Sequence, residues 1–130
     1  MHKPTEAELE ILQVLWKRGA CTVREVHEQL SQQKDTGYTT TLKLMQMMHE
    51  KGILKRNESQ RSHVYEALWQ EEEVQKSLLA RFVETAFGGS AMKLVMQALG
   101  NSKTTEKELK QIKEMINQIE QEQQKQKGGE

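Results

Sequence analysis

The first half of the chain alternates short apolar stretches with polar turns at the spacing of amphipathic helices. A capping box, in which Thr5 is followed by Glu8, predicts a helix start near residue 6, because each side chain can satisfy the other residue's backbone amide. Apolar residues then recur at helical spacing until Gly19, a residue typical of helix ends. We expect the core face of this helix to consist of Leu9, Leu12, Leu15 and Trp16.

A second capping box, formed by Thr22 and Glu25, predicts a second short helix directly after the first turn. Its apolar residues Val23, Val26 and Leu30 are spaced so that they share one face. The polar stretch 31–35 then favours a turn.

A third helix is predicted from about Tyr38, and the glycine at position 52 favours its end. One face of this helix is apolar and would bury Thr41, Leu44, Met45 and Met48. The other face is polar and carries Thr39, Lys43, Gln46 and Glu50. Three short helices separated by turns indicate a helix-turn-helix core.

The pattern changes after Gly52, where the residues no longer follow a helical period. Two short segments, 53–57 and 63–67, flank a polar tip at 58–62 and predict a β-hairpin. A hairpin beside the second and third helices would make the domain a winged helix.

The second half of the chain reads as three further helices. One is predicted over 71–87 and is stopped by Gly88-Gly89, the next is capped by Ser90 and ends near Gly100, and a third capping box, Thr105 with Glu108, opens the last. In that last helix the apolar residues recur at intervals of three and four, a heptad-like seam able to grip other helices: Leu109, Ile112, Ile116 and Ile119.

These patterns predict a mainly α fold of the α+β class with three parts. Residues 1–68 would form the winged helix-turn-helix domain with its small hairpin wing, 69–127 a three-helix dimerisation region, and 128–130 a disordered tail. Hydrophobic residues make up 35% of the chain and the mean hydropathy is -0.80, which is low for a self-sufficient globule of 130 residues. We therefore expect a homodimer.

Charge is distributed unevenly although the formal net charge is zero. Between Lys34 and His63 there are six Lys and Arg residues against three Asp and Glu residues, so the predicted third helix and wing carry a modest basic excess. The single cysteine, Cys21, rules out an internal disulfide and fits a cytoplasmic protein. No apolar run is long enough to span a membrane, so we expect no membrane insertion.

Candidate chemistry is sparse. No nucleophile–base pair, glycine-rich phosphate loop or carboxylate pair stands out, so we do not expect an enzyme or a cofactor. The histidines His27, His49 and His63 lack metal-ligand spacing, and we expect structural or surface roles for them rather than a metal site.

Several short motifs occur in a specific order and spacing: Leu15-Trp16, Val23-Arg24-Glu25-Val26, Tyr38-Thr39-Thr40 with Met48 and Lys51-Gly52, Arg61 and Tyr65, Phe87-Gly88-Gly89-Ser90, and Thr105 with Glu108-Leu109. Together they resemble the BlaI/MecI type of penicillinase repressors, a family of winged-helix transcriptional regulators that includes the CopY copper repressors. The resemblance covers about residues 4–124 and implies a dimer that binds a palindromic promoter operator, blocks transcription and is released by a signal.

The chain departs from the family pattern in three places. Met47-Met48 replaces an Arg-Leu pair late in the third helix, so a contact from that arginine is absent. Members released by a membrane sensor-protease are cut at an Asn-Phe bond, and the matching positions here are Gln97-Ala98, which leaves such a partner open. The copper branch has C-terminal Cys-x-Cys motifs that this chain lacks, which excludes copper sensing by that route.

The polar face of the third helix is the candidate reader of double-stranded DNA. We expect Thr39, Lys43 and Gln46 to contact base edges and Tyr38 and Thr40 to contact phosphates, although an ordinary solvated surface would have the same composition. The wing carries three further candidates for phosphate contacts, Lys55, Arg56 and Arg61. Ordinary solvated surface charges are an equally good interpretation of these residues.

The apolar residues of the second half are the candidate dimer interface, since paired operator half-sites require paired readers. A closed three-helix core within one chain is the alternative. A second functional class also stays open, namely a winged-helix protein–protein interaction module without DNA binding, which the zero net charge would suit. The expected interface residues are Leu78, Phe82, Phe87, Leu94, Leu99, Ile112, Ile116 and Ile119.

Overall fold

A computed structural model describes residues 1–101 and 103–128 of the chain. It divides into two compact units, Met1–Phe82 and Val83–Glu130. This division lies within a helix, whereas the boundary predicted from the sequence follows residue 68. Trp69 and Val74 are part of the first unit. The Trp16 indole nitrogen donates to the Trp69 carbonyl oxygen at 2.9 Å, and Val74 is fully buried.

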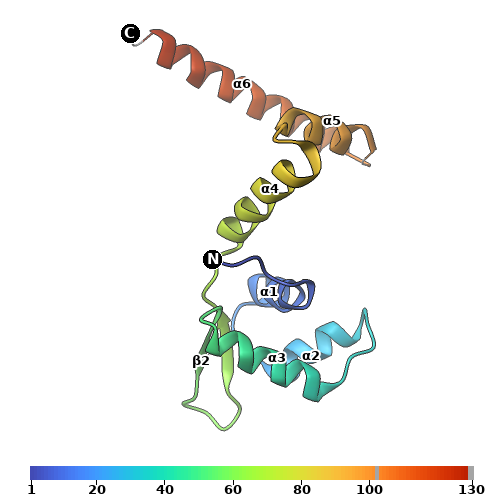
Figure 1. The fold of residues 1–130 in the computed structure, drawn as a ribbon, viewed down its shortest axis with the longest axis vertical. Coiled ribbons are helices and arrows are strands. Elements are labelled where there is room, and N and C mark those ends of the chain that lie inside the picture. Colours follow the sequence, from blue (N-terminus) through green and yellow to red (C-terminus); the bar gives the residue numbers. More distant parts are fainter. Residues whose placement is uncertain (102, 129–130) are drawn as a thin grey trace. The chain divides into compact units, whose positions relative to one another are not determined.

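The first unit combines helices with a three-stranded antiparallel sheet (Figure 1). The predicted mainly α, α+β winged helix is therefore confirmed. In chain order its complete elements are α1 (Glu6–Arg18), β1 (Cys21–Thr22), α2 (Val23–Ser31), α3 (Tyr38–Glu50), β2 (Leu54–Asn57) and β3 (Val64–Ala67).

The sheet extends the predicted hairpin by one strand. Strands β2 and β3 pair in antiparallel register, with Arg56 opposite Tyr65, and β1 pairs on the far side of β3, where Cys21 lies opposite Tyr65. The sequence did not indicate β1, because two residues are too few to show a period of two. This strand ties the turn between α1 and α2 to the wing.

The helix starts agree with the capping boxes read from the sequence. In α1 and α2, Thr5 and Thr22 each accept from the amide three residues later, and Glu8 and Glu25 each accept from the threonine amide. The hydrogen bonds to its threonine lower the pKa of Glu25 below its ordinary value. Gly19, at φ +83°, ends α1 as predicted.

The core of the first unit lies between α1, α2, α3 and the sheet. In α1, Ile11, Leu12 and Leu15 are buried, whereas the predicted Leu9 and Trp16 are only partly buried. The prediction missed Ile11 because several apolar stripes fit so short a helix. The buried hydrophobic residues of the core are Ile11, Leu12, Leu15, Cys21, Val23, Val26, Met45, Met48, Ile53, Leu54 and Tyr65.

Two buried side chains of the first unit carry groups that could in principle react or bind, namely Cys21 and Thr41. Burial raises the pKa of the Cys21 thiol, which is typical of a small buried filler rather than a reactive group. Thr41 is buried in α3 and donates to the Gly37 carbonyl oxygen at 3.4 Å, so its hydroxyl is satisfied inside the helix. Leu44 is only partly buried.

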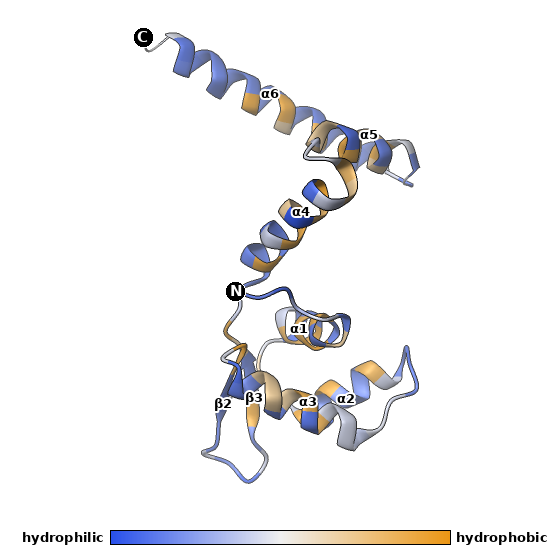
Figure 2. Ribbon diagram, viewed as in Figure 1, coloured by the Kyte–Doolittle hydropathy of each residue, from blue (hydrophilic) through white to orange (hydrophobic). Residues whose placement is uncertain are grey.

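The second unit consists of the end of α4 (Glu71–Phe87), α5 (Ala91–Asn101) and α6 (Glu106–Gly128). Gly88 and Gly89 both have positive φ and end α4 as predicted. Thr105 and Glu108 form the third capping box. None of the residues described between 83 and 128 is buried, and Figure 2 shows apolar residues on α5 and in the first part of α6, with a hydrophilic end to α6.

Helix α6 extends to Gly128, the first residue of the predicted tail, because the Gln, Glu and Lys residues before it are good helix formers. Residues 129–130 of that predicted tail lie outside the described residues.

Candidate nucleic-acid interface

Helix α3 exposes the polar face that the sequence predicted. Thr39, Lys43 and Gln46 are all exposed, while Met45 and Met48 on the opposite side are fully buried. The apolar side holds the helix on the core, so the polar side chains project away from it. Among the residues described, Lys43 makes no ion pair, and its ammonium group is available to an anionic partner.

The start of α3 differs from the starts of α1, α2 and α6, because its N-cap is Gly37 and no side chain caps it. The backbone amides at the start of a helix have no partner inside the helix and favour anions such as phosphate. Tyr38 and Thr39, the first residues of α3, are exposed at this end. Thr40 is also exposed but lines a small recess with Ala7 and Glu10 of α1, away from the wing.

Helix α2 buttresses this end of α3 through a histidine. His27 Nδ1 lies 3.2 Å from the Thr41 hydroxyl, and His27 Nε2 lies 3.2 Å from the Ser31 hydroxyl. The His27 ring also meets the Tyr38 ring edge to face at 5.7 Å. This histidine therefore has the structural role expected from the sequence and fixes the orientation of Tyr38.

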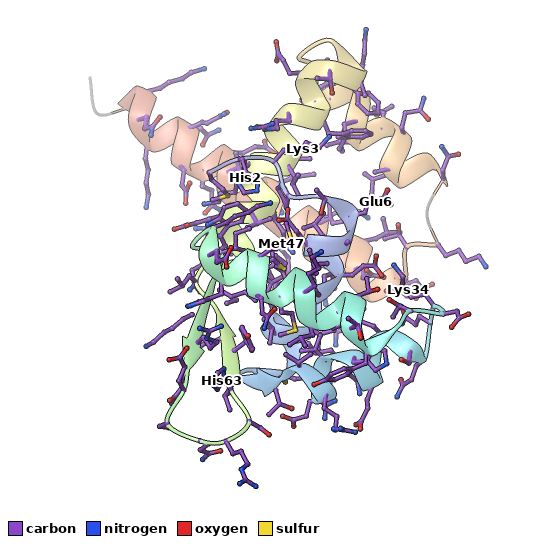
Figure 3. The ribbon with its side chains drawn as sticks, turned by 60° about the horizontal axis from the view of Figure 1, so that its bottom comes forward. His2, Lys3, Glu6, Lys34, Met47 and His63 are labelled. Atoms are coloured by element: carbon purple, nitrogen blue, oxygen red, sulfur yellow. The ribbon has the colours of Figure 1, made fainter. Side chains whose placement is uncertain are left out.

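A shallow groove of about 310 Å³ lies between the start of α2, α3 and the wing. It brings together three predicted residues, Tyr38, Gln46 and Arg61, and adds two that sequence reasoning missed, Arg24 and His63. Figure 3 marks His63 on the wing. The groove is lined by Thr22, Val23, Arg24, Tyr38, Leu42, Gln46, Arg61, Ser62, His63 and Tyr65.

Arg24 lies on the first turn of α2, and its guanidinium carbon is 5.8 Å from the centre of the Tyr38 ring. This stacking holds a positive charge beside the uncapped start of α3. The sequence places Arg24 at the exposed start of the predicted second helix. Only the fold shows that this first turn of α2 faces α3. Arg24 is consequently part of the candidate interface.

The three predicted cations of the wing have different surroundings. Arg61 lies at the exposed tip and lines the groove, and it makes no ion pair with any described residue. Arg56 is ion-paired with Glu58, and hydrogen bonding to Tyr65 and Glu58 raises its pKa. Its positive charge is thus already partly compensated within the wing.

Lys55 lies opposite Glu66 on the neighbouring strand and lines a recess behind the wing with Ala20. Because side chains alternate along a strand, Lys55 points to the other face of the sheet from Arg56 and Tyr65. The structure therefore does not bring Lys55 together with Arg61 in the groove beside α3.

The far end of α3 is fastened to α1 by a buried carboxylate. Glu8 Oε1 accepts from the Thr5 amide at 2.9 Å and lies 3.7 Å from His2 Nε2, and Glu8 Oε2 lies 3.6 Å from Lys51 Nζ. Burial raises the pKa of Glu8, but the Thr5 amide, Lys51 and His2 together outweigh it, so that the pKa lies below its ordinary value. The ionised carboxylate thus helps to position α3.

The described residues contain no group of three or more His, Cys, Asp or Glu side chains placed to hold a metal ion. In that same part of the chain, no helix combines the length and apolar character needed to cross a bilayer.

Comparison with known proteins identifies the family of this chain. The family model described as penicillinase repressor matches residues 4–118. The chain belongs to the penicillinase repressor family. The resemblance to BlaI/MecI repressors that the sequence motifs indicated is therefore confirmed.

Named relatives agree with this assignment. The methicillin resistance regulatory protein MecI of Staphylococcus aureus strain N315 is 20% identical over 113 residues, which are 87% of this chain and 92% of MecI. The transcriptional regulator BlaI of Mycobacterium tuberculosis strain CDC 1551 is 34% identical over 61 residues, 46% of this chain and 44% of BlaI. The chain is accordingly a BlaI/MecI-type transcriptional repressor.

A solved structure supports the winged-helix fold alone. A MarR family protein from Bacillus stearothermophilus superimposes with a TM-score of 0.55 at 16% sequence identity, covering 95% of this chain and 77% of the other.

Proposed function

We propose that this repressor binds a palindromic promoter operator as a cytoplasmic homodimer, inserting α3 into the major groove of each half-site. The observation that carries the proposal is the exposed face of Thr39, Lys43 and Gln46 on a helix whose opposite side is locked into the core. Lys and Gln side chains can make paired hydrogen bonds to guanine and adenine, respectively, and a threonine can contact either.

Contacts to the DNA backbone would surround this reading face. The uncapped start of α3 with Tyr38 suits one phosphate, and Arg24 and Arg61 border the groove beside it. Arg56 and Lys55 are weaker candidates, because Glu58 and Glu66 lie beside them. Phosphate neutralisation at these positions predicts binding that weakens steeply with salt.

Dimerisation through the second unit and α4 would place two such faces on one operator. Large apolar side chains remain exposed there, including Leu99, Ile116 and Ile119. A helical segment with so little buried surface is not expected to be stable alone, and a second copy of the same chain would cover it.

Release from the operator would follow a signal. Gln97 and Ala98, which stand at the family's cleavage positions, are exposed on α5. Incubating the operator complex with a membrane sensor-protease of the family and mapping the cut ends would test proteolytic release, and an intact chain would exclude that partner.

The proposal is tested by selecting fragments of genomic DNA with the purified full chain, then comparing the selected duplex with a scrambled one in mobility shifts over a range of salt. We expect the Lys43→Ala, Gln46→Ala double variant to lose about 1–3 kcal/mol of discrimination. The matched control, Gln13→Ala with Lys17→Ala, removes the same side chains from an exposed part of α1 and should leave discrimination unchanged.

A parent protein that enriches no fragment, or that binds the selected and the scrambled duplex equally, would overturn the proposal. Capture of a protein partner by the same chain, abolished by the α3 double variant, would instead support the protein–protein interaction module.

A further inference from the structure

Helix α3 carries an exposed apolar residue beside its polar reading face. Of residues 6–67, all of which the structure describes, the exposed large hydrophobic side chains are Tyr38 and Met47. The Tyr38 ring already contacts His27 and Arg24. Met47 is 42% exposed and lies four residues after Lys43, on the side of α3 away from the core (Figure 3 marks its position).

The chemistry of Met47 limits what it could contact in a major groove. Its thioether offers no strong hydrogen-bond donor or acceptor, so it cannot read the polar edges that suit Lys43 and Gln46. The apolar group that base pairs present in the major groove is the C5 methyl of thymine. A flexible, unbranched side chain adapts well to such a small apolar target.

We propose that Met47 is a specificity-determining residue that contacts a thymine methyl in each operator half-site. This inference rests on the proposed operator binding by α3 and refines it. The contact would make an A·T pair favourable next to the bases read by Lys43 and Gln46, at a position where neither polar side chain supplies the discrimination.

The test removes only the methyl group. Deoxyuridine differs from thymidine only in lacking the C5 methyl group. The thymines of the selected operator are replaced by deoxyuridine one pair at a time, at symmetric positions of the two half-sites. The affinity of the full chain is measured for each replacement. A replacement at one pair of symmetric positions removes two methyl groups. At the position that Met47 contacts, we expect each lost methyl group to weaken binding by roughly fourfold, the effect of returning one methyl group to water.

Variants of Met47 assign that loss to this side chain. Met47→Gln, a polar residue of similar length, should bind the thymine and deoxyuridine operators equally, because it gains nothing from the methyl. Met47→Leu, the matched control, keeps an apolar side chain and should retain most of the difference. Equal thermal unfolding of the three proteins would show that the exposed substitution leaves the fold intact.

A replacement scan in which no thymine shows an effect, or in which Met47→Gln retains the full effect, overturns the role of Met47 while leaving operator binding in place. If the parent protein discriminates no DNA sequence at all, the operator proposal fails, and the Met47 inference fails with it.

Discussion

The two compact units of this chain handle their apolar residues in opposite ways. In the first unit, Leu12 and Val26 are fully inaccessible to solvent within a core shared by three helices and a sheet. In the second unit, Ile116 keeps 50% of its surface exposed, and none of the described residues between 83 and 128 is buried. The first unit can therefore be stable by itself, whereas the second exposes the kind of surface that protein interfaces cover.

The largest effect should follow from placing charges on the exposed seam of α6. In an Ile112→Glu, Ile116→Glu variant, the carboxylates would be buried in the proposed dimer interface, and we expect a monomer in sedimentation experiments. Loss of the second reader should weaken operator binding by about 100-fold or more. A Lys113→Glu variant, with a charge change at an exposed polar position of the same helix, is the control.

The fragment 1–82 sharpens the same comparison. It retains Trp69 and Val74, which complete the first unit, and should give a folded monomer by circular dichroism and sedimentation. A fragment that stays dimeric would place the interface within residues 1–82, which include Leu78 and Phe82 of α4. An Ile112→Glu, Ile116→Glu variant that stays dimeric would exclude α6 from the interface.

The core of the first unit should respond to truncation of a single side chain. We expect Leu12→Ala to lower the free energy of unfolding by about 2–5 kcal/mol, because the side chain is completely buried and leaves a cavity. Urea unfolding of fragment 1–82 measures this loss at several protein concentrations. A midpoint that depends on concentration would contradict the view that this core needs no second copy.

Glu8 tests whether contacts within the first unit hold α3 in place. The pKa of Glu8 is lowered in the folded state, so its carboxylate stabilises the folded protein at pH values above the unfolded-state pKa near 4.5. This stabilisation is lost as the pH falls through the folded-state pKa. Glu8→Gln should lower the free energy of unfolding by about 1 kcal/mol at neutral pH, and this loss should shrink as the pH falls. Unfolding curves at pH 7 and at a series of pH values below 4.5 measure this change, and a cost that does not fall with the pH would contradict this role.

The smallest effects are expected in the wing. Arg61→Ala should lower the slope of log affinity against log salt by about 1, the loss of one phosphate contact. Arg56→Ala should change the slope less, because Glu58 already compensates its charge. Mobility shifts between low and physiological salt compare the two variants, and a larger change for Arg56 would reverse their assigned roles.

Local features of this chain were predictable from short stretches of sequence. The capping boxes at Thr5, Thr22 and Thr105 and the stop at Gly88-Gly89 were read correctly, because caps and turns depend on residues within four positions of one another. The exposed side of α3 followed from helical spacing in the same way.

Only the tertiary structure could decide which distant segments meet. The pairing of Cys21 with Tyr65, the choice of Ile11 over Leu9 for the core and the meeting of Arg24 with Arg61 across one groove all join positions far apart in sequence or depend on what packs opposite. Such pairings arise from the closing of the whole core, for which a single sequence shows no local signal. The sequence by itself therefore determined the helices, the wing and the family, and packing determined how the candidate interface is assembled.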